Sequence, residues 1–324
     1  MISIIVIGKN EGWRLEKCLK SISGLIASSS IEFEVIYMDS NSSDNSIEVA
    51  LVYPEIRIFK IVGSCNAAVA RNVGANESKG DVLFFVDGDM EIQSDFFNYI
   101  LNEKKQLISE YITGHIDDCF YDNAGTFIGK SPRTYINCIP TEIQELKQNG
   151  GIYLITKKKW VEVGGMRTKF KINEDLDLTI RLRKIKIKIV RIPHLICLHH
   201  TIDYRNEIRM WNMILAGYGL YPGVIFRVHL FDVYVVKRFV RADYSAIFLM
   251  LALLFYKSVT VLVLYILILL SRALVHTFTI KADIKKIRYF MERLLYQFLF
   301  DILIWIGFFF FFPKKITFMY KKIR

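Results

Sequence analysis

The chain has 324 residues, enough to bury a full hydrophobic core and to form two structural units. Its net charge of +11 arises entirely after residue 225, because residues 1–225 carry 27 basic and 27 acidic side chains. Basic charge confined to an apolar C-terminal third favours anionic lipid head groups as partners and argues against nucleic acid, whose binding proteins carry a basic patch on the folded domain. Five cysteines without a Cys-x-x-Cys pair argue against a zinc site or a disulfide framework.

Strand-like and helix-like segments alternate over the first 95 residues. Apolar, β-branched runs predict strands at 2–7, 33–38, 56–61 and 82–86. Between them, apolar spacing predicts helices at 13–22 and 67–75, and Asp44 is the expected cap of a further helix. Strands that alternate with helices predict a parallel sheet with right-handed connections.

The middle of the chain is a mixture. Strands are predicted at 111–115, 151–155 and 187–192, and a helix at 177–184. From about residue 206 an amphipathic helix is expected. Residues 227–241 then mix apolar and basic side chains in the manner of a helix that lies at a membrane interface.

Two long apolar stretches predict a membrane region. Residues 246–270 contain one charge, Lys257, and would extend about 37 Å as a helix, whereas residues 294–312 contain one charge, Asp301. The alternative is a pair of buried helices in a soluble bundle. Basic residues flank the second stretch on both sides, which conflicts with a positive-inside bias for two simple spans. Lys257 in the middle of 246–270 leaves open that this stretch forms a re-entrant hairpin instead. We therefore expect a protein of the cell (inner or plasma) membrane, multi-pass or re-entrant, with its catalytic part in the reducing cytoplasm.

Asp87-Gly88-Asp89 follows directly on the apolar run 82–86. Ligands of open α/β sheets bind beyond the carboxyl ends of the strands. Two carboxylates at such a place could hold a hard divalent cation against a diphosphate, and Gly88 would let the backbone approach the ligand closely. An ordinary turn is the alternative, since acidic residues and glycine are common in turns.

Asp39 and Arg71 are two further candidates. Asp39 ends the second predicted strand and could accept hydrogen bonds from a ribose or a base edge, or could form only an Asx turn. Arg71 lies in a predicted helix, where its guanidinium could meet a phosphate or a pyrimidine carbonyl; a surface ion pair is the alternative.

Two more pairs of polar residues lie later in the chain. Glu174 and Asp175 begin a predicted helix, where the helix dipole favours carboxylates, but Asp175 could also take a proton if it lies near the cation. His199 and His200 follow an apolar run, and a neutral imidazole from one of them could complete the cation's ligands beside Asp89. A partly buried histidine without such a role is the alternative.

Several segments occur in the order in which one known family carries its motifs. They are the opening Ile7-Gly8-Lys9-Asn10-Glu11-Gly12, then 37–46, Ala70-Arg71-Asn72-Val73-Gly74, Val86-Asp87-Gly88-Asp89, 164–167 with 174–182, and Leu198-His199-His200 with Trp211 and 216–218. On these segments, over residues 1 to about 220, the chain resembles the family 2 glycosyltransferases of the GT-A fold. The resemblance implies an α/β, Rossmann-like mixed sheet. We expect a GT-A catalytic domain at 1–220, an interfacial segment at 221–243, and transmembrane or interfacial helices at 244–324.

The resemblance also implies roles for individual residues. A nucleotide-diphospho-sugar donor, expected to be a UDP-sugar, would lie against Ile7, Gly8, Asn10, Glu11, Asp39, Arg71, Asp87 and Gly88. Mg²⁺ or Mn²⁺ would be held by Asp87, Asp89 and His199. Asp175 would be the general base of a single inverting displacement. Trp160, Gly165 and Glu174 would form the acceptor side, with Trp160 as an apolar platform for a sugar ring.

The expected function follows from the resemblance together with the C-terminal apolar stretches. We expect sugar transfer to a membrane-associated acceptor, such as a lipid-linked saccharide in cell-surface polysaccharide synthesis. One alternative is a polyisoprenyl-phosphate glycosyl synthase, which charges a lipid phosphate directly. The other is a catalytically inactive, membrane-tethered sugar-binding scaffold.

Overall fold

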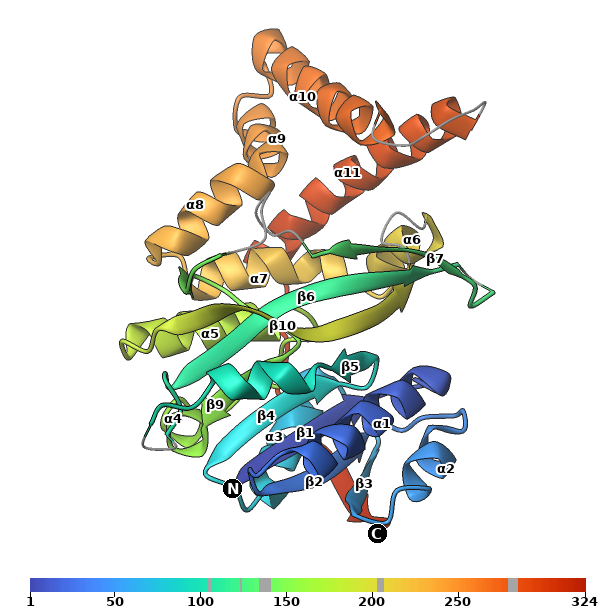
Figure 1. Cartoon of the computed structure of the whole chain (residues 1–324). Helices are drawn as coiled ribbons and strands as arrows, with labels where there is room; N and C mark the ends of the chain where they lie inside the picture. The colour runs from blue at the N-terminus through green and yellow to red at the C-terminus, as the bar shows by residue number, and fades with distance from the viewer. Residues whose placement is uncertain (104–105, 123, 134–140, 203–206, 279–284) are drawn as a thin grey trace. The chain divides into compact units, whose positions relative to one another are not determined.

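The computed structural model describes the whole chain except residues 104–105, 123, 134–140, 203–206 and 279–284 (Figure 1). It divides into two compact units. The first comprises residues 1–203 together with 314–324, and the second comprises residues 204–313.

The first unit begins with four parallel strands, β1 (Ile2–Gly8), β2 (Phe33–Asp39), β3 (Ile56–Val62) and β4 (Val82–Asp87), in the order β3-β2-β1-β4. Every residue of β1 is buried. Alternate side chains of β1 enter two separate apolar clusters, one shared with helix α1 (Trp13–Ser28) and one with helix α3 (Ala67–Glu77). Because both faces of this sheet are covered, its strands are continuous apolar runs, which is why the sequence predicted them. The short helix α2 (Ser46–Leu51) lies between β2 and β3 in the chain.

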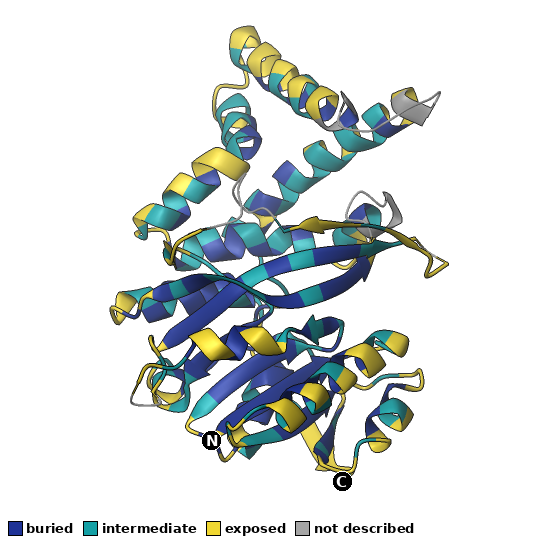
Figure 2. Cartoon of the chain, in the orientation of Figure 1, coloured by how far each residue is buried: buried dark blue, intermediate teal, exposed yellow. Residues whose placement is uncertain are grey.

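The remaining strands make the sheet mixed. The strand β9 (Tyr153–Thr156) runs antiparallel to both β4 and β6 (Tyr111–Tyr121), and β10 (Ile189–Ile202) runs parallel to β6. Shorter strands add to this part: β5 (Met90–Ile92) and β8 (Gln144–Leu146) pair with β10, and β7 (Phe127–Pro132) pairs with β6. The 3-10 turn η1 (Ser94–Tyr99) and the helices α4 (Lys157–Glu162) and α5 (Glu174–Lys184) complete the unit. The central strands, such as β1 and β4, are among the most deeply buried parts of it, whereas β7 is mostly exposed (Figure 2). The mixed α/β sheet that the sequence predicted is therefore confirmed.

A strand that the sequence did not predict closes one edge of the sheet. The strand β11 (Met319–Lys322) pairs antiparallel with β3. The guanidinium of Arg324 then donates hydrogen bonds to four carbonyl oxygens, those of Ala50 (3.1 Å), Leu51 (2.9 Å), Ile56 (3.1 Å) and Tyr53. All four residues of β11 are exposed, so no apolar alternation marked them as a strand.

The second unit is helical. Its elements are α6 (Glu207–Leu215), the 3-10 turn η2 (Tyr218–Leu220), α7 (Tyr221–Val228), α8 (Val233–Ala242), α9 (Tyr244–Leu254), α10 (Val259–Phe278) and α11 (Lys285–Phe309). Two glycines let α7 and η2 approach α11 closely. A Cβ on Gly223 would lie 1.9 Å from the carbonyl oxygen of Ile304, and one on Gly307 would lie 1.9 Å from that of Leu220.

The membrane prediction is wrong. Within the residues that the structure describes, no helix combines the length and the apolar character that a bilayer crossing requires. The apolar stretch 246–270 breaks at residues 255–258, so that α9 has only 11 residues, about 16 Å against a hydrocarbon core of about 30 Å. Most of the stretch 294–312 belongs to α11, which ends at Phe309 and in which Asp301 is buried and accepts hydrogen bonds from Ser245 and Gln297 at 2.8 Å each. The expected cell-membrane localisation, multi-pass or re-entrant, is corrected by these observations.

Candidate functional site

The polar residues that end three neighbouring strands meet at one edge of the sheet. Gly8 at the end of β1 is paired in register with Asp39 of β2, and Ile7 is paired with Asp87 of β4. The backbone N–H of Gly88 donates to the carbonyl oxygen of Ile7 at 2.8 Å. The first strand and the Asp87-Gly88-Asp89 turn therefore touch directly.

The loop after β1 is fixed to the loop after β2. Asn10 has a left-handed backbone (φ 58°), its Oδ1 accepts from the backbone N–H of Ser43 at 2.9 Å, and its own N–H donates to Ser42 Oγ at 3.0 Å. Glu11 follows Asn10, and burial, with a smaller contribution from Asp89, raises the pKa of its carboxyl to about 7. Asp39 is fully buried and accepts from the N–H of Ser42 at 3.0 Å. These residues line the carboxyl edge of the sheet with oxygen and backbone groups.

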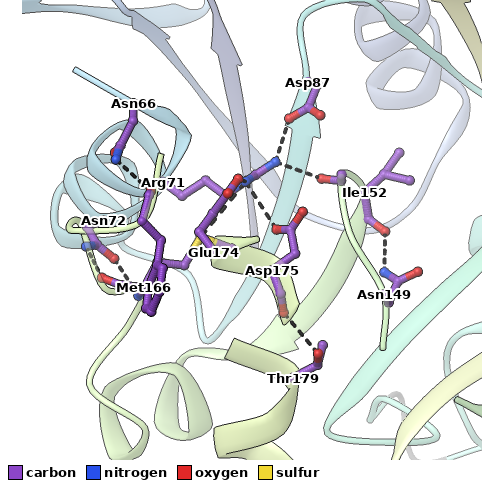
Figure 3. A network of polar contacts seen from close by, with 12 residues as sticks. Asn66, Arg71, Asn72, Asp87, Asn149, Ile152, Met166, Glu174, Asp175 and Thr179 are labelled. Carbon is purple, nitrogen blue, oxygen red and sulfur yellow. Dashed lines mark hydrogen bonds and ion pairs between the residues drawn. The ribbon is translucent and has the colours of Figure 1, made fainter. Parts of the chain in front are cut away.

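Arg71 is the centre of a buried ionic network (Figure 3). Its side chain is 2% exposed, and its Nη2 lies 2.7 Å from Asp87 Oδ1. The other terminal nitrogen, Nη1, lies 3.4 Å from both Glu174 Oε1 and Asp175 Oδ1. Nη2 also donates to the carbonyl oxygen of Gly151 at 3.3 Å. In this structure Arg71 thus gathers three carboxylates from β4 and α5.

Two asparagines that the sequence analysis passed over hold the segment before α5 against α3. Asn66 caps α3 by accepting from Val69 N at 2.9 Å, and its amide donates to the carbonyl oxygens of Thr168 and Phe170 at 2.8 Å each. Asn72 exchanges two hydrogen bonds with the backbone of Met166, at 2.8 and 2.9 Å. Both flank Arg71 in sequence, and both fix the segment that brings α5 to it.

The carboxylates around Arg71 have raised pKa values. Burial, then repulsion from Asp175, raises the pKa of Glu174 to about 8. Burial also raises the pKa of Asp87 to about 6, although Arg71 opposes the shift. The pKa of Asp175 is raised by burial, against the opposing effects of Arg71 and the backbone N–H of Gly151. A carboxylate with a raised pKa is suited to accept a proton near neutral pH.

A glycine pair lies beside these acids, and Gly150 makes room for Asp175. A Cβ on Gly150 would lie 2.4 Å from Asp175 Oδ2, whereas one on Gly151 would lie 3.0 Å from Met90 Cε and at an ordinary contact distance, 3.5 Å, from Asp87 Oδ2. Gly151 also has a φ of +77°, which side chains with a Cβ rarely adopt. The sequence analysis treated residue 151 only as the start of a strand. The Gly-Gly pair before an apolar run was the signal that could have drawn attention to this loop.

Asp89 and His199 face each other. His199 Nε2 lies 3.3 Å from Asp89 Oδ2, and the backbone N–H of His200 donates to the Asp89 carbonyl oxygen at 2.8 Å. Burial alone would raise the pKa of Asp89, but its hydrogen bond and ion pair with His199 outweigh burial and lower it. Burial would likewise lower the pKa of His199, but hydrogen bonds to Asp118 and Asp89 raise it to about 9. His200 instead contacts Glu91 through Nε2 and the Tyr121 hydroxyl through Nδ1, both at 2.9 Å.

The residues at this place fit a hard cation in part. Asp89 Oδ1 is buried and has no hydrogen-bond partner among the residues described. The same residues contain no group of three His, Cys, Asp or Glu side chains that could hold a metal by themselves. Asp89 and His199 can therefore supply two ligands, and substrate oxygens and water would have to supply the others.

The acceptor-side expectations need correction. The Trp160 side chain is 5% exposed and packs on Phe85, with ring centroids 4.6 Å apart, so it cannot offer a platform to a sugar. The reason is that α4 turns this residue toward the apolar core rather than toward the strand ends. Glu174 is also buried, and Gly165 (φ +62°) serves the packing of its loop, since its carbonyl oxygen accepts from Arg181 at 2.8 Å.

Comparisons with known proteins identify the family to which the chain belongs. The model of the family described as Glycosyl transferase family 2 matches residues 3–176, which include every candidate site residue except His199 and His200. An uncharacterized glycosyltransferase of Haemophilus influenzae is 29% identical over 193 residues, 56% of this chain and 62% of that protein. The poly(ribitol-phosphate) beta-N-acetylglucosaminyltransferase TarP of Staphylococcus aureus is 30% identical over 117 residues, 35% of this chain and 36% of TarP. The match thus spans less than two thirds of the length of either relative.

A solved structure of GalNAc-T7 with UDP, GalNAc and Mn²⁺ superposes on 62% of this chain and 44% of its own, with a TM-score of 0.49 and 17% identity.

Proposed function

Because the chain belongs to glycosyl transferase family 2, we propose that it transfers a sugar from a nucleotide-diphospho-sugar to an acceptor hydroxyl. The observation that carries this proposal is the network in which Arg71 holds Asp87 and Asp175 beside the facing pair Asp89 and His199. This network combines a carboxylate that could take a proton, Asp175, with a place for a cation that could neutralise a diphosphate.

The donor would lie over the carboxyl ends of β1, β2 and β4, as ligands of open α/β sheets do. Ile7, Gly8 and Gly88 would offer backbone groups, and Asn10, Glu11 and Asp39 polar side chains, to the nucleoside. Arg71 is 2% exposed and already paired with acidic groups, so it would act on the donor through Asp87. The expected donor is a UDP-sugar.

Mg²⁺ or Mn²⁺ would be held by Asp89 and His199, with the free oxygen of Asp87 as a further candidate ligand. The buried, unpartnered Oδ1 of Asp89 supports this assignment. When bound, the ion would supply positive charge against the diphosphate. His199 would need to present an unprotonated Nε2 to it, and Asp89 would keep its charge because its pKa is lowered.

Asp175 would be the general base of an inverting displacement. It would accept the proton of the acceptor hydroxyl while that oxygen forms a bond to the anomeric carbon and the nucleoside diphosphate leaves. Two features support this role: burial raises the pKa of Asp175, and Arg71 fixes Oδ1 at 3.4 Å. Glu174, whose pKa is raised to about 8, would remain protonated at neutral pH and would shape the site.

We propose a lipid-linked saccharide as the acceptor. Support comes from the second unit, in which α9, α10 and the segment between them expose large apolar side chains, among them Leu253, Phe255 and Val259 (Figure 2). Residues 226–324 also carry 16 basic and only five acidic side chains, which suits an acceptor with anionic phosphates.

The test uses the full chain with UDP-, GDP- and dTDP-sugars, each with Mn²⁺, Mg²⁺ or EDTA. We expect one donor to bind and to be slowly hydrolysed in a metal-dependent way, and Asp89→Ala to abolish both. Asp175→Asn should keep donor binding and lose transfer to a hydroxyl acceptor. Transfer that survives Asp175→Asn would favour a polyisoprenyl-phosphate synthase, because a phosphate acceptor has no hydroxyl proton to remove. No donor binding under any metal would refute the enzyme proposal in favour of an inactive scaffold.

A further inference from the structure

We propose that Asp118 is a positioning residue for His199: it holds the imidazole by Nδ1–H so that Nε2 faces Asp89, and Arg133 holds Asp118 in turn. The inference rests on the proposed function where it concerns the cation. Asp118 would touch neither donor nor acceptor and would act only through the histidine.

The register of two strands places these residues together. In the parallel pair of β6 and β10, Asp118 is the partner of His199, so that both side chains lie on the same face of the sheet. His199 Nδ1 lies 2.7 Å from Asp118 Oδ1, while Nε2 lies 3.3 Å from Asp89 Oδ2. The side chains of His199 and Asp118 are 10% and 5% exposed. Asp118 thus holds the buried imidazole ring at Nδ1, and the ring directs Nε2 at Asp89.

Arg133 fixes the carboxylate. Its Nε lies 3.1 and 3.0 Å from the two oxygens of Asp118, and its Nη2 also contacts Oδ1. Nη2 comes close to His199 Nδ1 as well. In the proposed tautomer Nδ1 carries the proton, so that Nδ1–H and the Arg133 guanidinium, both donors, bond to the Asp118 carboxylate rather than to each other. Asp118 therefore accepts from two sides, and its orientation is fixed independently of the histidine.

The neighbouring histidine provides an internal comparison. His200 has a protein partner at each ring nitrogen, the Tyr121 hydroxyl and Glu91, and neither partner has an unsatisfied buried oxygen among the described residues. His199 differs from His200, because its Nε2 faces Asp89, whose buried Oδ1 has no hydrogen-bond partner among the described residues. A metal-ligating histidine commonly donates its second N–H to a carboxylate, which fixes the ring and its tautomer. The arrangement of Asp118, His199 and Asp89 matches that pattern.

The experiment measures Mn²⁺ binding and the protonation of the His199 ring in the full chain. Mn²⁺ alone is titrated, and the free ion is counted by electron paramagnetic resonance. Asp118→Ala should weaken Mn²⁺ binding by about 10- to 100-fold. Asp118→Asn, which retains an oxygen acceptor and much of the fold, should fall between Asp118→Ala and the unaltered chain. The matched control is Asp117→Ala, because Asp117 is the next residue of β6 and pairs with Lys130 at 2.9 Å, away from His199.

Two further readouts separate positioning from a general structural role. In a His199→Gln background, Asp118→Ala should cause no additional loss of Mn²⁺ binding, since coupled residues are not additive. Long-range ¹⁵N–¹H spectra, with the His199 signal assigned by its absence in His199→Gln, should show Nδ1 protonated in the unaltered chain and a changed Nδ1 signal in Asp118→Ala.

The outcomes distinguish the two proposals. An unchanged His199 signal in Asp118→Ala, or an additive loss in the double variant, would overturn the role of Asp118. If the unaltered chain bound no Mn²⁺, the metal site under Proposed function and the cation part of this inference would both fall. The ring spectra would then still decide whether Asp118 positions His199.

Discussion

Replacing Gly150 with alanine would displace the proposed base without altering its chemistry. The added Cβ would lie 2.4 Å from Asp175 Oδ2, 3.1 Å from its Cγ and 3.3 Å from its Cβ. Ordinary contacts begin at 3.4 Å, so the carboxylate must withdraw by about 1 Å. Rotation of the side chain alone would not relieve all three contacts, and Thr179, which donates to the Asp175 carbonyl oxygen at 2.9 Å, holds the backbone in place. We therefore expect Asp175 to move away from Arg71.

The expected effect is on turnover. A misplacement of about 1 Å can cost about 100-fold in rate, which corresponds to about 2.7 kcal/mol in the activation free energy. Donor KM should stay unchanged, because in the proposed mechanism Asp175 contacts the acceptor and not the nucleotide. A lower kcat at constant donor KM would mean that an interaction made only in the transition state has been lost.

The assay is steady-state release of the nucleoside diphosphate with the donor and acceptor that the panel identifies. Gly24→Ala is the matched control, since a Cβ at this position of α1 has nothing within 4 Å. It should leave kcat and KM unchanged and stabilise the helix by about 0.5–1 kcal/mol. If Gly150→Ala kept the full kcat while its thermal unfolding matched that of the unaltered chain, the placement of Asp175 as the base would be refuted.

Two other substitutions test charges that the structure buries. Arg71→Met should destabilise the first unit by about 3–5 kcal/mol in urea unfolding, because it leaves Asp87 and its acidic neighbours without their cation. Arg71→Lys keeps a positive charge and should lose less stability. An Arg71→Met variant as stable as the unaltered chain would contradict this prediction. Burial raises the pKa of Asp301 from 3.8 to about 6, so the folded chain binds a proton there more tightly than the unfolded chain. Stability from this group is fully present below about pH 4 and is lost as the pH rises through 6, by up to about 3 kcal/mol. Asp301→Asn should remove that part of the pH dependence of thermal unfolding, and a slope as steep as before would show that another group is responsible.

The sequence predicted the positions of the strands more accurately than the roles of single side chains. Strands such as β1 and β4 are buried on both faces, so their apolar runs are visible without any knowledge of their neighbours. The position of Asp39 and Asp87 at the same edge of the sheet, on either side of β1, also followed from the sequence, because parallel strands end at a common edge. Local pattern was sufficient for both predictions.

Other features depend on distant partners and could not be predicted. The environment of Arg71 is set by α5, more than 100 residues later in the chain, so its burial was invisible in the local sequence. Trp160 was placed on the acceptor side by the family resemblance, but its side chain faces the core and packs on Phe85 of β4, which is distant in the sequence. The apolar stretch 246–270 was expected either to span a membrane or to form a re-entrant hairpin, and hydropathy alone does not show that the chain breaks at 255–258, around Lys257.

The pairing of β11 with β3 makes the helical unit an insertion in the fold of the first unit. Residues 1–203 and 314–324 belong to one sheet, although 110 residues separate them in the chain. A fragment that stops before residue 314 would leave the N–H and C=O groups of β3 without their antiparallel partner, and open strand edges promote aggregation. A shorter fragment that keeps this edge of the sheet paired must therefore retain residues 314–324, with Arg324 on the carbonyl oxygens of residues 50–56.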